Sequence, residues 1–274
     1  MLLCASIQKP RYAIRSTWGS VKLFRQWRLH LVFLLGIDPT TDPNSHIEQR
    51  LRDESEEFGD MVMGNFVDSY RNLTYKHLMG YKWVSTFCPT AKFILKSDDD
   101  IYADIFQIID VLLMELINAR KTYACLNMWG AKPNRTMGNR WYIPKEVFPS
   151  DTYPDYCSGS AYLMRADDAS KIYSISNRTK FFWVDDVFVT GVLREKYDEI
   201  ADSGSNARLE ILSFDHLYHL DAKTELINWC SADLSTNQLN YHFVLLDDEN
   251  FIRDMYCMWN KVRLMRFAMN LGST

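Results

Sequence analysis

The chain has 274 residues, 47% of them hydrophobic, so it is long and apolar enough to bury a sizeable core. Its 31 basic and 35 acidic residues give a net charge of -4 without a dense Lys/Arg block, which argues against nucleic-acid binding. No run of about 18 apolar residues occurs, and the start MLLCASIQKP lacks the pattern of a signal peptide. We therefore expect a folded domain without a membrane anchor in this sequence.

Two arginines stand early in the chain, in the segment RYAIRSTWG that follows the first apolar residues. Arg11 and Arg15 are four residues apart, so one turn of a helix places both guanidinium groups on the same side. Such a pair suits a phosphate or pyrophosphate near the ligand-binding edge of a sheet. Solvated surface arginines are the simpler interpretation of these two residues alone.

Short continuous apolar runs predict strands that are covered on both faces, at residues 29–36, 91–96, 122–129 and 160–165. Residues 76–88 and 105–117 have apolar side chains at helical spacing and predict helices between these strands. The alternation predicts an α/β fold with a mainly parallel central sheet flanked by helices. In such folds ligands bind outside the carboxyl ends of the strands.

Three consecutive aspartates, Asp98, Asp99 and Asp100, stand at the end of the predicted strand FILK. Adjacent carboxylates repel one another, so this pattern favours a bound cation, and oxygen ligands suit Mg²⁺ or Mn²⁺. The alternative is an acidic cap on a helix that begins near Ile101. The residues that follow do not fit a calcium-binding EF-hand loop, because Ala103 stands where that loop needs glycine.

Residues 130–154 are rich in Pro, Asn and Gly and predict a long loop over a site. Trp141 and Tyr142 lie in this loop.

A second acidic pair, Asp185 and Asp186, opens an apolar helix. One carboxylate fits a helix cap, and a partly desolvated carboxylate also fits a general base. His216 and His219 are each a structural histidine or a ligand that completes a carboxylate site. At the end of the chain, residues 262–274 form a basic amphipathic segment, and we expect a packed helix there more than a membrane-surface one.

The six cysteines include no CxxC pair, which argues against a zinc ribbon, and they allow 15 disulfide connectivities, of which Cys88 with Cys157 is one. Three Asn-x-Ser/Thr sequons, at Asn72, Asn134 and Asn177, are glycosylation candidates if the chain enters a secretory compartment.

Five motifs in register, from about residue 2 to residue 230, resemble family-31 glycosyltransferases, the β1,3-galactosyltransferase and β1,3-N-acetylglucosaminyltransferase family. RYAIRSTWG is similar to the family's Arg-x-x-Ile-Arg-x-Thr-Trp opening, and DSYRNLTYK to its Asp-x-Tyr-x-Asn-Leu-Thr-x-Lys motif. FILKSDDDIY, YPDYCSGSAYLM and VDDVFVTG resemble its metal motif, its Tyr-Pro-x-Tyr-Cys-Ser-Gly segment and its Glu-Asp-Val segment. Here Asp185 stands where the family usually has Glu, and Thr190 lengthens the spacing to the following glycine by one.

The resemblance implies a GT-A type fold and an inverting hexosyltransferase that uses a UDP-sugar with Mn²⁺, Mg²⁺ being possible. It implies a metal site of Asp100, Asp98 and His219, where His219 is preferred because HLDAKTEL resembles a family segment. The implied nucleotide-sugar residues are Arg11, Arg15, Asp68, Asp98 and Asp99. Asp186 is the implied base. Trp141, Tyr142 and Trp183 are candidates for the acceptor site, because aromatic faces suit the apolar faces of hexoses, and core packing is the expected role of at least one of them.

We expect residues 1–274 to form one catalytic domain, with a nucleotide-sugar half to about residue 120 and an acceptor half from about 121. The expected partners are a UDP-sugar and a glycan acceptor on a glycoprotein or glycolipid, with transfer of galactose or an N-acetylhexosamine in a β1,3 linkage. The resemblance implies a Golgi membrane location with the catalytic domain in the lumen. The alternative is a catalytically silent relative that binds glycan or protein.

Overall fold

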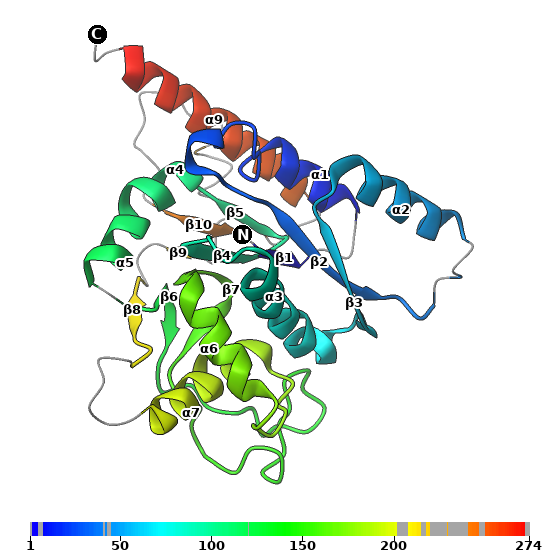
Figure 1. The fold of residues 1–274 in the computed structure, drawn as a ribbon, viewed down its shortest axis with the longest axis vertical. Helices are drawn as coiled ribbons and strands as arrows, with labels where there is room; N and C mark the ends of the chain where they lie inside the picture. The colour runs from blue at the N-terminus through cyan, green and yellow to red at the C-terminus, as the bar shows by residue number, and fades with distance from the viewer. Residues whose placement is uncertain are drawn as a thin grey trace.

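The computed structural model describes residues 2–4, 8–40, 42, 45–119, 121–201, 208–214, 218–219, 229, 241–246 and 250–271. In this part of the chain, seven strands form the main sheet in the order β3-β2-β1-β4-β7-β6-β8 (Figure 1). They are β1 (Leu2–Cys4), β2 (Val32–Ile37), β3 (Met61–Val67), β4 (Phe93–Asp98), β6 (Tyr123–Met128), β7 (Tyr156–Arg165) and β8 (Ile211–Ser213). A second sheet joins β5 (Ile101–Ala103), β10 (Phe243–Leu245) and β9 (Tyr218–His219).

All neighbouring strands of the main sheet are parallel except at β7, which runs antiparallel to both β4 and β6. The four predicted strands are present as β2, β4, β6 and β7. Both faces of the sheet are buried, as the continuous apolar runs predict: Phe33 and Leu35 of β2 join one core cluster, and Val32 and Leu34 join the other. The expected α/β class with a mainly parallel sheet is confirmed.

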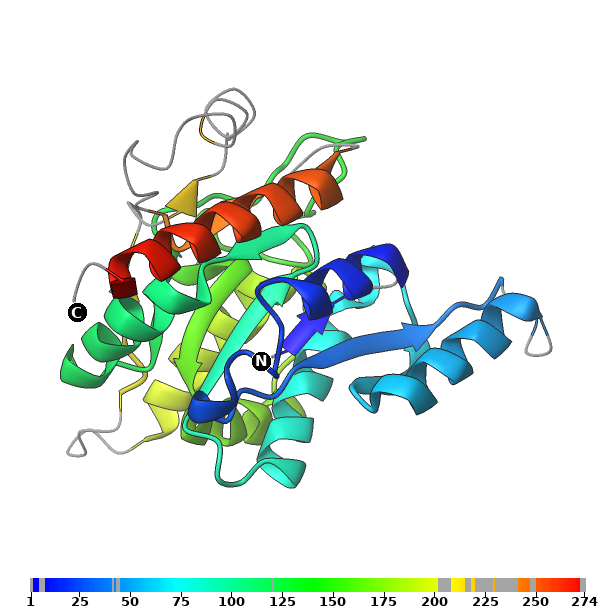
Figure 2. The ribbon, with the colours of Figure 1, turned by 90° about the horizontal axis from the view of Figure 1, so that it is seen from above.

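Helices cover both faces of the sheet (Figures 1 and 2). One core cluster contains side chains of α1 (Gln8–Ser16), of the continuous helix α4 (Ile105–Gln107), η3 (Ile108–Leu112) and α5 (Leu113–Ala119), and of α9 (Phe251–Leu271). The other contains side chains of α3 (Leu73–Phe87), α6 (Ala166–Ser176), η4 (Val187–Val192) and α7 (Leu193–Ile200). The remaining helical elements are η1 (Arg25–Trp27), α2 (His46–Phe58) and η2 (Tyr70–Asn72).

Both predicted helices are present, and the C-terminal helix packs on the core through Met255, Met258 and Trp259. None of the described helices combines the length and the apolar character that a membrane crossing requires.

The helix expected near Ile101 begins four residues later, because Ile101–Ala103 pair with β10 as strand β5. Its N-cap is Asp104, whose Oδ1 accepts the backbone N–H of Gln107 at 3.1 Å. The three aspartates at positions 98–100 therefore do not cap this helix.

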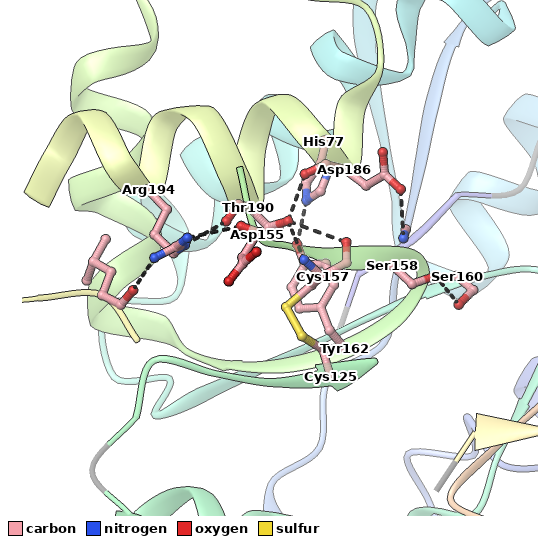
Figure 3. Close-up of a disulfide and its surroundings, with 12 residues drawn as sticks. His77, Cys125, Asp155, Cys157, Ser158, Ser160, Tyr162, Asp186, Thr190 and Arg194 are labelled. Atoms are coloured by element: carbon pink, nitrogen blue, oxygen red, sulfur yellow. Dashed lines mark hydrogen bonds between the residues drawn. A yellow bond between two sulfur atoms is a disulfide. The ribbon is translucent and has the colours of Figure 1, made fainter. Parts of the chain in front are cut away.

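A disulfide joins Cys125 of β6 to Cys157 of β7, with the two Cα atoms 5.5 Å apart (Figure 3). The pairing of Cys88 with Cys157 is thus wrong, and Cys88 at the end of α3 is a free thiol. The two bonded cysteines lie on neighbouring strands, where the register between β6 and β7 shifts. Cys257 also forms a disulfide.

A buried ion cluster fastens α1 to α2 and to the start of β3. The Nε and Nη2 atoms of Arg11 donate to the two carboxylate oxygens of Glu54 at 2.7 and 2.6 Å. Arg15 donates to Glu54 at 2.7 Å and, through two nitrogens, to Asp60 at 2.7 and 2.8 Å. The side chains of Arg11 and Glu54 are only 2% and 1% exposed, so each charge depends on its partner.

We expect Glu54→Ala to lower the free energy of unfolding by about 3–5 kcal/mol, because it removes the carboxylate that pairs with the buried Arg11 and one of the two carboxylates that bind Arg15. The exposed Glu56 of the same helix provides the control, and Glu56→Ala should change stability by less than about 0.5 kcal/mol. Urea unfolding at pH 7 measures both variants. Equal stabilities of the two variants would show that the cluster is not structural.

Candidate active site

The carboxyl ends of parallel strands β1 to β4 meet at one edge of the sheet, and the predicted acidic residues gather there. Asp98 is the last residue of β4, and Asp68 follows directly after β3. Asp68 accepts the backbone N–H of Gly36 at 2.9 Å and pairs with the buried Lys76 at 2.6 Å. It therefore ties the ends of β2 and β3 to α3.

Lys96 links the aspartate motif to the neighbouring strand. It is buried in β4, and its Nζ donates both to Asp98 and to the backbone carbonyl of Gly159 in β7. Burial, followed by the charges of Asp100 and Asp98, raises the pKa of Asp99 to about 6. The charges of Asp98 and Asp100 thus disfavour ionisation of Asp99, and carboxylate oxygens are the donors that a hard divalent cation prefers.

The sheet edge holds no complete set of three acidic, histidine or cysteine ligands within the described part of the chain. The backbone of His219 lies in β9, paired with Val244 of β10, while its side chain and all of His216 lie outside the described residues. The role of His219 as a metal ligand stays a prediction.

Asp186 stands at the start of η4 and faces β7. Its Oδ1 accepts the backbone N–H of Val187 at 2.8 Å, and its Oδ2 accepts that of Gly159 at 3.1 Å. A Cβ at position 159 would lie 3.2 Å from the Cβ of Asp186, so glycine allows this close approach. The predicted capping role is therefore confirmed, and the side chain also lines a pocket.

The environment of Asp186 favours a protonatable carboxyl group. Burial, followed by the negative charge of Asp185, raises the pKa of Asp186 to about 7. Asp185 shows the opposite behaviour: burial disfavours its charge, but the hydrogen bond from His77 and the nearby Lys96 outweigh it and lower its pKa. Two adjacent carboxyl groups with pKa values pushed apart are typical of an acid–base site.

A chain of buried polar groups lies beneath Asp185. His77 Nδ1 is 3.0 Å from Asp185 Oδ2, and His77 Nε2 contacts the hydroxyl of Tyr162. Tyr81 in turn lies 2.7 Å from that hydroxyl. Burial lowers the pKa of His77, so the neutral ring donates from Nδ1 to Asp185 and accepts from Tyr162. Nothing in the sequence marks His77 as part of a site.

The additional residue Thr190 lies in a π-helical turn of η4. A single extra residue in a helix is commonly accommodated as such a turn. The Thr190 hydroxyl donates to the carbonyl of Asp186 at 2.7 Å and accepts the backbone N–H of Cys157 at 2.9 Å (Figure 3). The turn that holds Asp186 is thereby joined to the strand that carries the disulfide.

A cavity of about 470 Å³ lies over these groups. Its polar lining includes Asp98, Lys96, Asp185 and Asp186. Aromatic side chains form much of the remaining wall, namely Tyr70, Trp141, Tyr153, Tyr156 and Trp183.

The structure brings together some of the predicted site residues and separates others. Trp141 and Trp183 line the cavity with Asp98 and Asp186, whereas Tyr142 is not among its lining residues. The guanidinium groups of Arg11 and Arg15 are engaged by Glu54 and Asp60, away from this cavity. Their role as nucleotide ligands stays a prediction.

The three sequons lie in different settings. Asn177 is exposed at the end of α6. Asn72 is half-buried, and its amide donates to the carbonyl of Val67 at 2.9 Å. Asn134 lines the cavity, and its side-chain oxygen accepts the N–H of Thr136 at 2.9 Å. Of the three, Asn177 is the most open to modification.

The chain is similar to two mammalian enzymes. It is 38% identical over 185 residues to beta-1,3-galactosyltransferase 1 of Homo sapiens, covering 68% of this chain and 56% of that protein. It is 36% identical over 182 residues to beta-1,3-galactosyltransferase 2 of Mus musculus, covering 66% of this chain and 43% of that protein. The chain thus spans about half the length of these relatives.

Among solved structures, a glycosyltransferase involved in the glycosylation of the major capsid of PBCV-1 covers 94% of this chain and 96% of that chain. Its 9% identity and TM-score of 0.37 are too low to support an argument. The Galactosyltransferase family model, in contrast, matches residues 9–201, which is more than half of the sequence. The chain therefore belongs to the galactosyltransferase family.

Proposed function

We propose that this chain is the catalytic part of an inverting hexosyltransferase. It moves galactose or an N-acetylhexosamine from a UDP-sugar to a hydroxyl of a glycan acceptor and forms a β1,3 linkage. The observation that carries the proposal is that Asp186, with its raised pKa, and Asp98 of the aspartate motif line one aromatic-walled cavity. Family membership and the two named relatives support the same chemistry.

Asp186 is the base of this reaction. Its carboxylate accepts the proton of the acceptor hydroxyl as that oxygen attacks the anomeric carbon and the bond to the diphosphate breaks. One displacement inverts the anomeric centre, so no second catalytic carboxylate is required. The backbone N–H groups of Val187 and Gly159 fix both oxygens of Asp186, which orients the base before the acceptor arrives.

The aspartate motif suits Mn²⁺ or Mg²⁺, because it offers only oxygen ligands that repel one another without a cation. Asp98 and Asp100 would hold the metal, with His219 as the predicted third ligand. When bound, the metal neutralises the charge that develops on the departing diphosphate. Asp68 and Asp99 are proposed donor contacts at the same edge of the sheet.

A catalytically silent binding relative is the second candidate. The raised pKa of Asp186 argues against it, since a glycan-binding module has no need for a base. A Golgi membrane location remains part of the proposal, and the disulfide between Cys125 and Cys157 supports an oxidising compartment.

We expect Asp186→Asn to lower kcat for sugar transfer by at least about 100-fold, because the amide cannot accept the acceptor proton. UDP-sugar binding, measured by calorimetry, should remain. Asp167→Asn, an exposed carboxylate at the start of α6, is the matched control and should keep full activity. Full transfer by the Asp186 variant would rule out its role as base.

The pH dependence of kcat tests the environment of Asp186. Transfer requires the ionised carboxylate, so kcat should fall as the pH drops through about 7. Asp185→Asn removes a neighbouring negative charge and should move this fall to lower pH. An unchanged pH profile in this variant would mean that Asp185 does not influence the base.

Chelation tests the metal assignment. EDTA should abolish transfer, and Mn²⁺ should restore it in the wild type but not in Asp100→Asn. UDP binding by the EDTA-treated protein, measured by filter retention, gives a readout that does not depend on turnover. This binding should decrease. Full activity in EDTA would exclude the metal.

A further inference from the structure

The outer wall of the cavity is a platform of three aromatic side chains from separate segments: Tyr70 of η2, Trp141 of the long loop, and Trp183 before η4. The indole N–H of Trp141 donates to the Tyr70 hydroxyl at 2.6 Å, and the rings of Tyr70 and Trp183 lie 6.1 Å apart. Tyr70 is 40% exposed and Trp141 is 51% exposed. Large ordered aromatic side chains left open to solvent mark a binding surface.

Two arginines stack on this platform. The guanidinium carbon of Arg71 lies 3.6 Å from the ring centre of Trp183. That of Arg140 lies 4.0 Å from the ring centre of Tyr70 and 5.6 Å from that of Trp141. Both side chains are exposed. Lys132, also exposed, lines the cavity beside them.

Neither Arg71 nor Arg140 has a carboxylate partner within the described part of the chain, whereas the charge of Lys132 acts on Asp151. Other basic groups of the same loop are occupied, since Lys145 pairs with Asp151 and Arg135 donates to the carbonyls of Ile143, Phe148 and Ser150. An arginine that stacks through its face keeps its N–H edges open, and those edges bind an oxyanion in a bidentate manner.

The position of the arginines limits where such an anion can sit. They flank the aromatic rings instead of lining the cavity floor, where Asp98, Asp185 and Asp186 would repel an anion. A sugar that accepts next to Asp186 would therefore be neutral, and an anion bound by the arginines would belong to a neighbouring unit of the acceptor.

We propose that the acceptor of this enzyme is an anionic glycan, in which a neutral terminal hexose enters the cavity and a carboxylate or sulfate on the next sugar binds Arg71 and Arg140. Lys132 adds a third positive charge on the same side. This inference rests on the proposed transferase function and names its acceptor class.

Matched disaccharides test the inference with the full chain. The terminal sugar is galactose, N-acetylglucosamine or N-acetylgalactosamine. Each is linked to a second sugar, which is N-acetylglucosamine, N-acetylglucosamine 6-sulfate or glucuronate. Binding is measured by tryptophan fluorescence with UDP and Mn²⁺ present, and transfer is measured in parallel. At least one anionic disaccharide should bind about tenfold more tightly than its neutral counterpart, and added salt should reduce this gain. The sulfate and glucuronate arms distinguish the two anions.

The double variant Arg71→Gln, Arg140→Gln should abolish the preference for the anionic disaccharide and leave binding of the neutral one unchanged. Arg50→Gln, an exposed arginine of α2 without a carboxylate partner in the described structure, is the control and should keep the preference. Equal binding of each matched pair, or no binding of any disaccharide, would overturn the inference.

A rise in the KM for the donor in the double variant would also overturn it, because the arginines would then serve the diphosphate. Hydrolysis of the UDP-sugar without acceptor separates this inference from the proposed function. If the wild type hydrolyses the UDP-sugar but binds anionic and neutral disaccharides equally, only the acceptor class is refuted. If it neither hydrolyses the UDP-sugar nor transfers the sugar, the transferase function is refuted.

Discussion

The buried ammonium group of Lys96 is the interaction on which the site depends. It joins Asp98 of β4 to the carbonyl of Gly159 in β7, at the place where the sheet changes from parallel to antiparallel. Gly159 in turn donates its N–H to Asp186. One buried cation thus connects the aspartate motif with the proposed base, and its charge favours the ionised form of three nearby carboxyl groups, Asp98, Asp185 and Asp186.

The division of labour between Asp185 and Asp186 follows from their surroundings. Asp185 points to a buried imidazole that stabilises its charge, whereas Asp186 accepts two backbone N–H groups and lines the cavity. Burial, followed by the stable charge on Asp185, raises the pKa of Asp186, so two identical residues supply one structural anion and one proposed base. The network of Tyr162 and Tyr81 behind His77 keeps this arrangement rigid.

The sequence predicts the helices and strands well, because the apolar runs of the strands and the helical spacing of apolar residues in the helices are both clear. Continuous apolar runs locate four strands, and helical spacing locates α3 and the helix from Ile105. The short strand at Ile101–Ala103 is missed since its partner β10 lies about 140 residues later in the sequence, so no local pattern marks it. The cysteine pairing fails for the same reason: spacing along the chain does not reveal that β6 and β7 are neighbours.

The site is predicted in part. Motifs locate Asp98 and Asp186, and the structure places both in one cavity. The arginines of α1 are aligned by one helical turn, but the sequence does not reveal the carboxylates that engage them, which stand some 40 residues away. His77 and Lys96 are missed since their function depends on contacts between elements. A lysine within an otherwise apolar strand was the one available indication for Lys96.

The anomeric configuration of the product tests the central claim most directly. A single displacement with Asp186 as the base converts an α-linked UDP-sugar into a β-linked product, and proton NMR of the isolated oligosaccharide distinguishes the two configurations. The account predicts a β1,3-linked product. An α-linked product would require two displacements or a different course of reaction, and it would contradict the assignment of one carboxylate as the sole catalytic base.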